Sequence, residues 1–268
     1  MTQPAFDTTY AADAAQNYQR YFVPTIAAPL AADLLEAARL EPDERVLDVA
    51  CGTGVVTRLA AKQVAGRGKA AGLDANAGML AVARASTPPE LAIEWYETTA
   101  EAIPLGDDSF DVALCQQSLQ FFANRQAALR EIRRILSPGG RLLVNVPGPK
   151  PALFAILGEA LAQHIDARAA ALLDVVFSLH DADELRDLMR SAGFAVVQVQ
   201  AARKTLPLPP PAEFLWQYLH STPLASMIAQ APASRRDALE SHVVAGWQPF
   251  VVNGTLMLDL GITTVVAA

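Results

Sequence analysis

The chain has 268 residues, of which 52% are hydrophobic and 18% charged, and its formal net charge is −7. This is enough apolar material for one large domain or for one domain with a substantial insertion. No basic stretch offsets the acidity, which argues against a nucleic acid as the main partner. No window approaches the roughly eighteen uninterrupted apolar residues of a membrane span, and no basic region followed by an apolar run marks a signal peptide. We expect a soluble cytoplasmic protein with no membrane partner.

The cysteines and histidines show neither a metal-binding nor a disulfide pattern. Cys51 and Cys115 are the two cysteines, and both fall at predicted buried strand ends without a Cys-x-x-Cys motif. A zinc site and a disulfide framework are therefore not expected. The four histidines have no metal-ligand spacing with one another. We expect no metal.

Residues 1–40 are predicted to form an N-terminal helical lid segment. Pro24 and Pro29 interrupt this region, and residues 30–40 have the apolar spacing of an amphipathic helix. The first 25 residues or so are polar and aromatic, with rings spaced as on one or two helical faces: Tyr10, Tyr18, Tyr21 and Phe22.

Residues 41–150 alternate between short apolar strands and helices. This alternation is typical of a doubly wound parallel sheet. Strands are expected at 45–49, 69–74, 91–97, 109–115 and 141–146, and helices at 53–64, 77–85 and 125–136.

Beyond residue 150 the pattern changes to two helical insertions separated by further parts of the core. Residues 151–178 are rich in alanine and leucine and have the periodicity of helices. Residues 204–250 form a second helical cap, which contains a proline-rich break at 206–211 and is helical after it. Between them, residues 179–203 contain a helix capped by Asp181 and a strand at 194–201. Residues 251–268 contain the final strand, expected at 255–266.

The most informative motif is the run Val-Leu-Asp-Val-Ala-Cys-Gly-Thr-Gly at 46–54, followed by Gly-Leu-Asp at 72–74. An apolar strand that ends in an acid and breaks into a glycine turn builds a nucleoside-binding crevice at the carboxyl ends of parallel strands. Gly52 and Gly54 lack Cβ, so the backbone can turn tightly and approach a ligand closely. Asp74 ends the second strand, where its carboxylate can accept hydrogen bonds from two ribose hydroxyls.

Four further motifs follow in order, at 75–80 (Ala-Asn-Ala-Gly-Met-Leu), 99–105 (Thr-Ala-Glu-Ala-Ile-Pro-Leu), 107–115 and 128–140. Together with the glycine turn they resemble the seven-stranded, class I S-adenosylmethionine (SAM)-dependent methyltransferases. The resemblance is closest to the bacterial small-molecule subgroup that includes quinone-biosynthesis enzymes. It implies a mostly parallel seven-stranded sheet whose last strand runs antiparallel beside strand six, with SAM as the cofactor.

The resemblance also implies roles for individual residues. Asp48 is expected beneath the glycine turn, and Gln116 and Gln117 beside the methionine portion of the cofactor. Two positions depart from the family pattern: Ala50 replaces its first glycine, and Thr99 replaces an acid that contacts the adenine, where a hydroxyl accepts without charge assistance. The implied cofactor-binding residues are Asp48, Ala50, Cys51, Gly52, Gly54, Asp74, Ala75, Met79, Thr99, Ala100, Glu101, Gln116 and Gln117.

The helical insertions and the N-terminal segment are expected to cover the cofactor and to form an apolar acceptor pocket. Tyr18, Tyr21, Phe177 and Trp216 are candidate substrate or lid residues. His164 and His220 lie in the expected cover and are candidate general bases, whereas His180 precedes a helix cap and His242 lies off the core motif. The apolar residues of the insertions are Phe154, Leu157, Leu161, Phe177, Phe214, Leu215, Trp216, Tyr218, Met227, Trp247 and Phe250.

The leading hypothesis is a SAM-dependent methyltransferase of secondary metabolism that acts on a small, largely apolar metabolite or natural product. Methylation at oxygen is favoured over methylation at carbon or nitrogen. The Asn-Pro-Pro-Tyr type of motif, with which other members hold an amino group, is missing, and this argues against methylation of DNA adenine or of glutamine. An alternative keeps the fold and the bound SAM but catalyses a rearrangement or cyclisation. A nicotinamide-dependent oxidoreductase is weaker, since Thr57 stands where Gly-x-Gly-x-x-Gly needs a small residue. A non-enzymatic binding protein with the cap as dimer interface is also open, as is the choice between monomer and homodimer.

Overall fold

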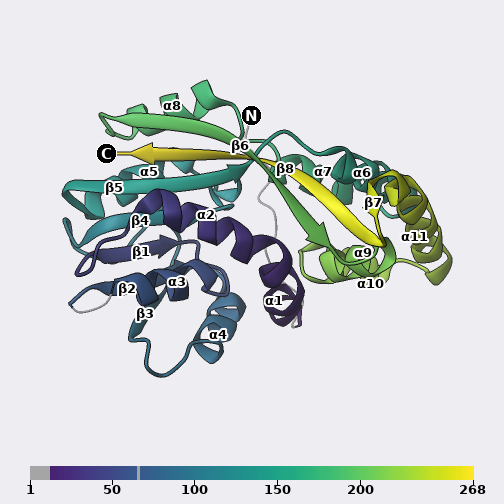
Figure 1. Cartoon of the computed structure of the whole chain (residues 1–268), viewed down its shortest axis with the longest axis horizontal. Coiled ribbons are helices and arrows are strands. Elements are labelled where there is room, and N and C mark those ends of the chain that lie inside the picture. Colours follow the sequence, from purple (N-terminus) through teal and green to yellow (C-terminus); the bar gives the residue numbers. More distant parts are fainter. Residues whose placement is uncertain (1–12, 65–66) are drawn as a thin grey trace.

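The computed structural model describes residues 13–64 and 67–268, so the first twelve residues of the expected lid segment, Tyr10 among them, lie outside the described residues. One mixed sheet forms the centre of the molecule, in the order β3-β2-β1-β4-β5-β8-β6 (Figure 1). The strands are β1 (Arg45–Val49), β2 (Lys69–Asp74), β3 (Ile93–Glu97), β4 (Phe110–Gln116), β5 (Leu136–Pro147), β6 (Val197–Leu208), β7 (Val251–Val252) and β8 (Thr255–Ala267).

The first five strands run parallel, as the sequence predicts. β1 pairs with β2 on one side and with β4 on the other, so the strand order reverses beside β1. Ligands of open parallel sheets bind at the carboxyl ends of the strands at such a reversal. The predicted last strand is also confirmed: β8 lies between β5 and β6 and is antiparallel to both.

Helices cover both faces of the sheet because successive residues of a buried strand point to opposite sides. Val46 packs with the helices α2 (Ala28–Ala38) and α3 (Val55–Gln63). Its neighbour Leu47 packs with α5 (Arg125–Ile135) and α8 (Ala182–Ser191) on the opposite face. The near-continuous apolar runs of the central strands follow from this double coverage.

The sixth strand is longer than the sequence predicts. We expected it to end at residue 201 and the prolines at 206–211 to break the chain, but β6 continues through Pro207 to Leu208. It remains paired with β8 to its end, where Leu208 lies opposite Leu256. Because β6 is an edge strand, a proline nitrogen can face its open side without the loss of a ladder hydrogen bond. The prediction of a break at Pro207 is therefore wrong.

The extended ends of β6 and β8 carry the helical cap, which we define as residues 151–178 and 209–250. Figure 1 shows the cap at one end of the sheet, where these two strands reach into it. Leu206, Leu208, Leu256 and Leu258 form one buried apolar cluster with the cap helices. These helices are α6 (Ala152–His164), α7 (Ala167–Val176), α9 (Pro211–His220), α10 (Leu224–Gln230) and α11 (Ala233–Trp247).

The N-terminal segment, residues 14–38, is helical but not uniformly wound. α1 (Ala14–Asn17) passes into η1 (Tyr18–Ala27), a π-helix that contains Pro24, and then into α2. The sequence predicts a helical segment over residues 1–40, with an amphipathic helix at 30–40, but not the π-winding of η1. π-helical segments are rare and are frequently found at functional sites. The surface that η1 covers is therefore a candidate part of a functional site.

Other parts of the predicted pattern hold with shifted boundaries. β5 begins at Leu136, directly after α5, rather than at residue 141. Asp181 caps α8 by accepting hydrogen bonds from the amides of Asp183 and Glu184, as expected. Within residues 13–64 and 67–268, no helix combines the length and apolar character needed to cross a membrane.

Candidate functional site

The turn that follows β1, residues 50–54, is held in a left-handed conformation; we call it the glycine loop. Ala50, Gly52 and Gly54 all have positive φ, at 56°, 55° and 80°. The amide of Cys51 donates to the carbonyl of Leu73, which ties the loop to the end of β2 at 2.9 Å. A left-handed residue that carries a Cβ costs about 1 kcal/mol, so the loop keeps its shape against some strain at Ala50.

The two glycines of the loop serve different purposes. A Cβ on Gly54 would lie 2.4 Å from Cη2 of Trp95, and one on Gly72 would lie 2.6 Å from the same indole ring. Gly54 is therefore needed for the packing of Trp95, rather than for close approach to a ligand as the sequence suggested. A Cβ on Gly52 would meet only the ring of Tyr18, at 4.0 Å. The open side of the loop thus lies at Gly52, directly below Tyr18.

Asp74 lies at the carboxyl end of β2 and orders the glycine loop. Its carboxylate accepts hydrogen bonds from the amides of Gly52 and Asn76, both at 2.8 Å. Burial raises the pKa of this carboxyl, and the two amides act in the opposite direction. Each carboxylate oxygen has a second lone pair, so Asp74 can hold the loop and still accept from ribose hydroxyls.

Asp48 is buried beneath the loop. Burial raises its pKa to about 7, while a 2.6 Å hydrogen bond from the hydroxyl of Thr57 lowers it. Asp74 raises this pKa further and Arg58 lowers it. Asp48 therefore supports the start of α3 through Thr57.

Residues expected around the adenosine gather after β2 and β3, which end side by side because Asp74 pairs with Glu97. Next to Asp74, Ala75 is exposed and Met79 is buried in the first turn of α4 (Ala77–Ala85), whose N-cap is Asn76. After β3, Thr99 is exposed and Ala100 is buried, and the carboxylate of Glu101 accepts from the amide of Asn124 at 3.2 Å. The structure therefore brings these residues to one edge of the sheet.

The loop after β4 approaches the glycine loop from the other side. The hydroxyl of Ser118 lies 3.4 Å from the carbonyl of Ala50. Gln117 has a positive φ of 53°, and its amide donates to the carbonyl of Asn145 at 2.8 Å. The Nε2 of Gln116 donates to the carbonyl of Ala27 at 3.0 Å. The side-chain nitrogens of Gln116 and Gln117 contact the backbone of η1 and the side chain of Asn145, respectively.

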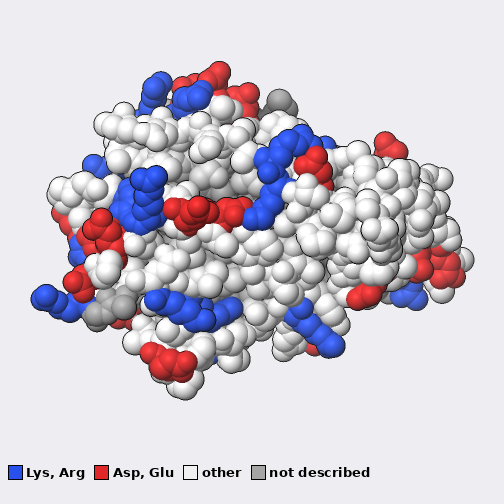
Figure 2. Space-filling view, viewed as in Figure 1, with Lys and Arg blue, Asp and Glu red and all other residues white. Residues whose placement is uncertain are grey.

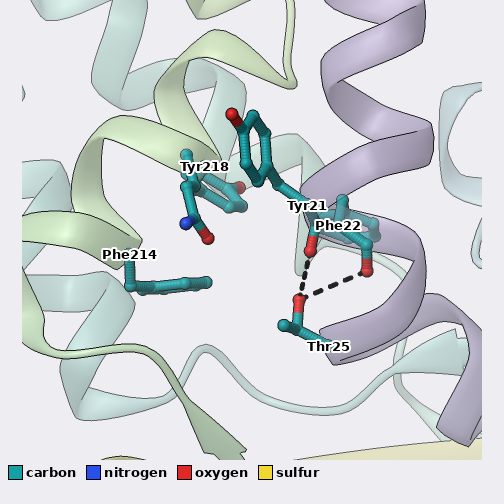
Figure 3. Close-up of a pocket in the computed structure, with 6 residues that line it drawn as sticks. Tyr21, Phe22, Thr25, Phe214 and Tyr218 are labelled. Carbon is teal, nitrogen blue, oxygen red and sulfur yellow. Dashed lines mark hydrogen bonds between the residues drawn. The ribbon is translucent and has the colours of Figure 1, made fainter.

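A small aromatic pocket lies between η1 and α9. The side chains leave no room for a water-sized sphere between them, and Figure 3 shows the labelled residues coming from two helices that face each other. The hydroxyl of Thr25 donates to the carbonyl of Tyr21 at 2.6 Å, so this polar group is held against its own helix. The lining residues are Tyr21, Phe22, Thr25, Phe214, Gln217 and Tyr218.

A series of neighbouring aromatic rings connects the glycine loop with this pocket. Tyr18, which lies over Gly52, stacks on Phe22 with a centroid distance of 4.8 Å. Phe22 in turn lies 6.3 Å from Tyr218, whose ring is 5.2 Å from that of Phe154 in the cap. The carboxyl ends of β1 and β4 therefore open toward an apolar, aromatic surface, which suits a planar or largely apolar ligand.

Comparison with known proteins fits this geometry. A family described as "Methyltransferase domain" matches residues 47–144. The demethylmenaquinone methyltransferase of Mycobacterium bovis is 42% identical over 120 residues, which are 44% of this chain and 48% of that protein. The ubiquinone/menaquinone biosynthesis C-methyltransferase of Pectobacterium atrosepticum is 34% identical over 178 residues, 60% of this chain and 70% of that protein. The chain belongs to the class I SAM-dependent methyltransferases.

A solved structure shows the same fold over nearly the whole chain. The phosphoethanolamine N-methyltransferase 2 of Haemonchus contortus, in complex with SAM, has a TM-score of 0.62 at 18% identity, covering 98% of this chain and 58% of that one. The matched part of the chain spans about half the length of the mycobacterial relative. Family membership decides against the nicotinamide-dependent oxidoreductase. Thr57, the residue that argued against it, is buried and bonded to Asp48.

The residues present suit SAM, the methyl donor of this family. Gly52 leaves an open place on the glycine loop, and each oxygen of Asp74 can accept a further hydrogen bond. The hydroxyl of Thr53 and the Oε1 of Gln116 are buried without a partner among the described residues, as expected for groups that face a bound molecule. These residues, with Met79 and the chain at 99–100, would hold the cofactor, and the bound group would supply an electrophilic methyl.

The two candidate bases lie in different surroundings. Nε2 of His164 is 3.1 Å from Nδ1 of His242, so His164 pairs within the cap and contacts no part of the glycine loop. The exposed ring of His220 stacks on Trp216, while its carbonyl accepts from Asn17 at 3.4 Å. The backbone of His220 therefore lies near the N-terminal segment, and its imidazole packs within α9.

The remaining candidate residues, Trp216 and Phe177, contact other side chains of the cap. The indole nitrogen of Trp216 donates to Glu240 at 2.7 Å. Phe177 is buried against Phe154, with a centroid distance of 5.2 Å. The carbonyl of Phe177 lies 2.9 Å from Nδ1 of His180, which supports the structural role expected for this histidine.

Three residues of the site were missed at the level of sequence. Trp95 gave no signal, because its contact with Gly54 depends on how β3 lies in the sheet. Phe22 was noted only as one of several aromatic residues. Asn145 did give a signal, since it is a polar residue within an apolar strand, and it is buried with an exposed fraction of 1%. Buried amides of this kind need hydrogen-bond partners, which it finds in the loop after β4.

Proposed function

We propose that the protein transfers a methyl group from SAM to a small, largely apolar acceptor that carries an aromatic or quinone-like ring. The observation that carries this proposal is the series of aromatic rings from Tyr18, above Gly52, to Phe22 and Tyr218 in the pocket. Flat apolar rings pack favourably on such surfaces. The names of both curated relatives, which concern quinones, support the same class of acceptor.

The relatives favour carbon as the methylated atom, in contrast to the oxygen favoured from the sequence alone. The Pectobacterium relative is named a C-methyltransferase. A ring carbon next to a phenolic hydroxyl becomes nucleophilic when that hydroxyl loses its proton. Among the described residues that line the pocket there is no carboxylate, ammonium, guanidinium or imidazole group. We therefore propose that the acidity of the acceptor itself, rather than a histidine of the protein, supplies the nucleophile.

The pocket would have to open to admit such a ring. As it stands it has no room for even a water-sized sphere, whereas sites that enclose drug-sized ligands have volumes of roughly 300–1,000 Å³. One wall belongs to η1 and the other to α9, so a small separation of these two helices enlarges it. The chain's own contributions to the reaction are then to align the acceptor behind the methyl group and to exclude water.

The test is product analysis with the purified protein, methyl-labelled SAM and a panel of hydroquinones, naphthols and catechols. The expected result is a product that gains one labelled methyl, with magnetic resonance locating it on ring carbon. A label on oxygen would correct the methylated atom and keep the rest. A product rearranged without a mass change would favour the alternative in which bound SAM is not consumed. No turnover of any acceptor under conditions where SAM binds would contradict the acceptor class.

A further inference from the structure

The N-terminal segment is attached to the carboxyl ends of the strands at one point, the junction between η1 and α2. Here three backbone carbonyls within residues 27–30 accept hydrogen bonds from side chains of three different strands. Gln116 of β4 donates to the carbonyl of Ala27 at 3.0 Å, and Asn145 of β5 reaches the carbonyl of Leu30 at 3.5 Å. Lys204 of β6 donates to the carbonyl of Pro29 at 3.1 Å.

The winding of the helix changes at this junction. At the junction the hydrogen bonds change from the i+5 pattern of a π-helix to the i+4 pattern of an α-helix, which disturbs the pairing of backbone carbonyls. Pro24 and Pro29 lack an N–H and so leave further carbonyls without a helical partner. Side-chain donors from outside the helix can satisfy such carbonyls. The segment is thus attached at the point where η1 passes into α2.

Of these three donors, Gln116 ends its strand at the cofactor crevice. It ends β4, beside the point at which the strand order reverses. A backbone carbonyl can only accept, so the side-chain nitrogen must face Ala27 and the oxygen is turned the other way. That oxygen is buried and has no partner among the described residues. One end of the amide therefore holds the segment, and the other end remains for a donor from a bound ligand or a water molecule.

The attached segment carries the residues that cover the site. Tyr18 lies over Gly52, and Phe22 and Thr25 belong to the wall of the aromatic pocket. All three lie on η1, which ends at Ala27. A loss of the bond at Ala27 would allow this part of the segment to move away from both the glycine loop and α9.

We propose that Gln116 is a positioning residue, whose amide holds the N-terminal segment closed over the cofactor loop and the acceptor pocket through the carbonyl of Ala27. The proposal rests on the methyl-transfer function proposed above. It predicts that loss of the amide loosens the segment locally, without a general loss of stability. It also predicts weaker binding of any ligand that the closed segment covers.

The test compares two matched variants, Gln116→Met and Gln120→Met. Gln120 is a suitable control because its Nε2 also donates locally, to the carbonyl of Gln117 at 2.9 Å, and its Oε1 is likewise buried without a partner among the described residues. No hydrogen bond of Gln120 to the described part of the N-terminal segment is present. Gln116→Glu is a second variant, since an ionised carboxylate has the same size but cannot donate to Ala27.

Amide hydrogen exchange of the full-length, ligand-free protein is the first measurement. Loss of one hydrogen bond corresponds to about fivefold to tenfold faster exchange, and we expect this at residues 18–30 in Gln116→Met and Gln116→Glu. Exchange at residues 142–147 of β5 should stay unchanged, as should that at 18–30 in Gln120→Met. Wild-type protection at 18–30 in both Gln116 variants, or an equal loss in Gln120→Met, would overturn the proposal.

Calorimetry with S-adenosylhomocysteine is the second measurement. The dissociation constant should rise about fivefold to tenfold in Gln116→Met and stay within about twofold of wild type in Gln120→Met, while both variants unfold at similar temperatures. An unchanged dissociation constant in Gln116→Met would overturn the link between the segment and the ligand. If the wild-type protein failed to bind, the proposed function would fall, and the exchange measurement would still test the contact at Ala27.

Discussion

Asp48→Asn should change how the stability of the protein depends on pH. Burial raises the pKa of Asp48 to about 7, from an ordinary value of 3.8. Between these two values the folded protein keeps a proton that the unfolded chain has released. Since stability falls with pH wherever the folded state binds more protons, Asp48 lowers the free energy of unfolding as the pH rises from 4 to 7.

The size of this effect follows from the shift. It is about three pKa units, and each unit corresponds to about 1.4 kcal/mol, so the full penalty at neutral pH is about 4 kcal/mol. Asparagine carries no charge at any of these pH values, and its side-chain oxygen can still accept the hydrogen bond from Thr57. The variant should therefore lose little at pH 4 and gain relative to wild type as the pH rises.

Urea unfolding at several pH values between 4 and 7.5 measures this difference. We expect the free energy of unfolding of Asp48→Asn minus that of wild type to increase by about 4 kcal/mol over this range. The exposed residue Asp237 provides a control, since Asp237→Asn should follow the wild-type pH dependence. Parallel curves for Asp48→Asn and wild type would refute the assignment of a buried, partly protonated carboxyl beneath the glycine loop.

Three further predictions concern the site and its surroundings. Asp74→Ala should weaken SAM binding by about tenfold or more, the effect of about 1.5–3 kcal/mol for a charge-involving hydrogen bond, and unchanged affinity in calorimetry would contradict the role of Asp74. Gly54→Ala should lower the unfolding temperature far more than Gly139→Ala. The backbone strain is the same, since φ is +80° and +81° at the two glycines, but only the Cβ at residue 54 would meet Trp95. Equal shifts in unfolding temperature would show that contact with the indole does not destabilise Gly54→Ala. His164→Phe should keep kcat within about threefold of wild type, whereas a general base contributes about a hundredfold or more.

The parallel core and the glycine loop could be predicted because their signals are local. The strand from Arg45 to Val49 and the one from Lys69 to Asp74 have the predicted bounds. Each is a short apolar run that ends in an acid, and both ends are visible in a window of a few residues. The position of Asp74 beside the loop then follows from parallel pairing alone.

The cap and the N-terminal segment could be predicted only in outline, because their details depend on tertiary contacts. Pro207 reads as a break, yet its place on an edge strand lets β6 continue into the cap. The π-winding of η1 has no sequence signature beyond Pro24, and its partner Gln116 lies far along the chain. His164 looked available as a base until the fold placed it against His242.

Electrostatic reasoning from the sequence has similar limits. The sequence gives the number of charged residues, 21 basic and 28 acidic. It does not show how these residues are arranged on the surface. On the face drawn in Figure 2, basic and acidic side chains lie next to one another. The lysine that holds the N-terminal segment, Lys204, also pairs with Asp33 at 2.6 Å. Such pairing of residues distant in the chain can be found only once the fold is known.

Calorimetric titration of the wild-type protein with SAM, S-adenosylhomocysteine and NAD tests the central claim most directly. The glycine loop, Asp74 and the family membership predict that the first two bind and NAD does not, and that Asp74→Ala weakens both. Binding of NAD alone, or no binding of either SAM or S-adenosylhomocysteine, would contradict the claim that this crevice holds the methyl donor.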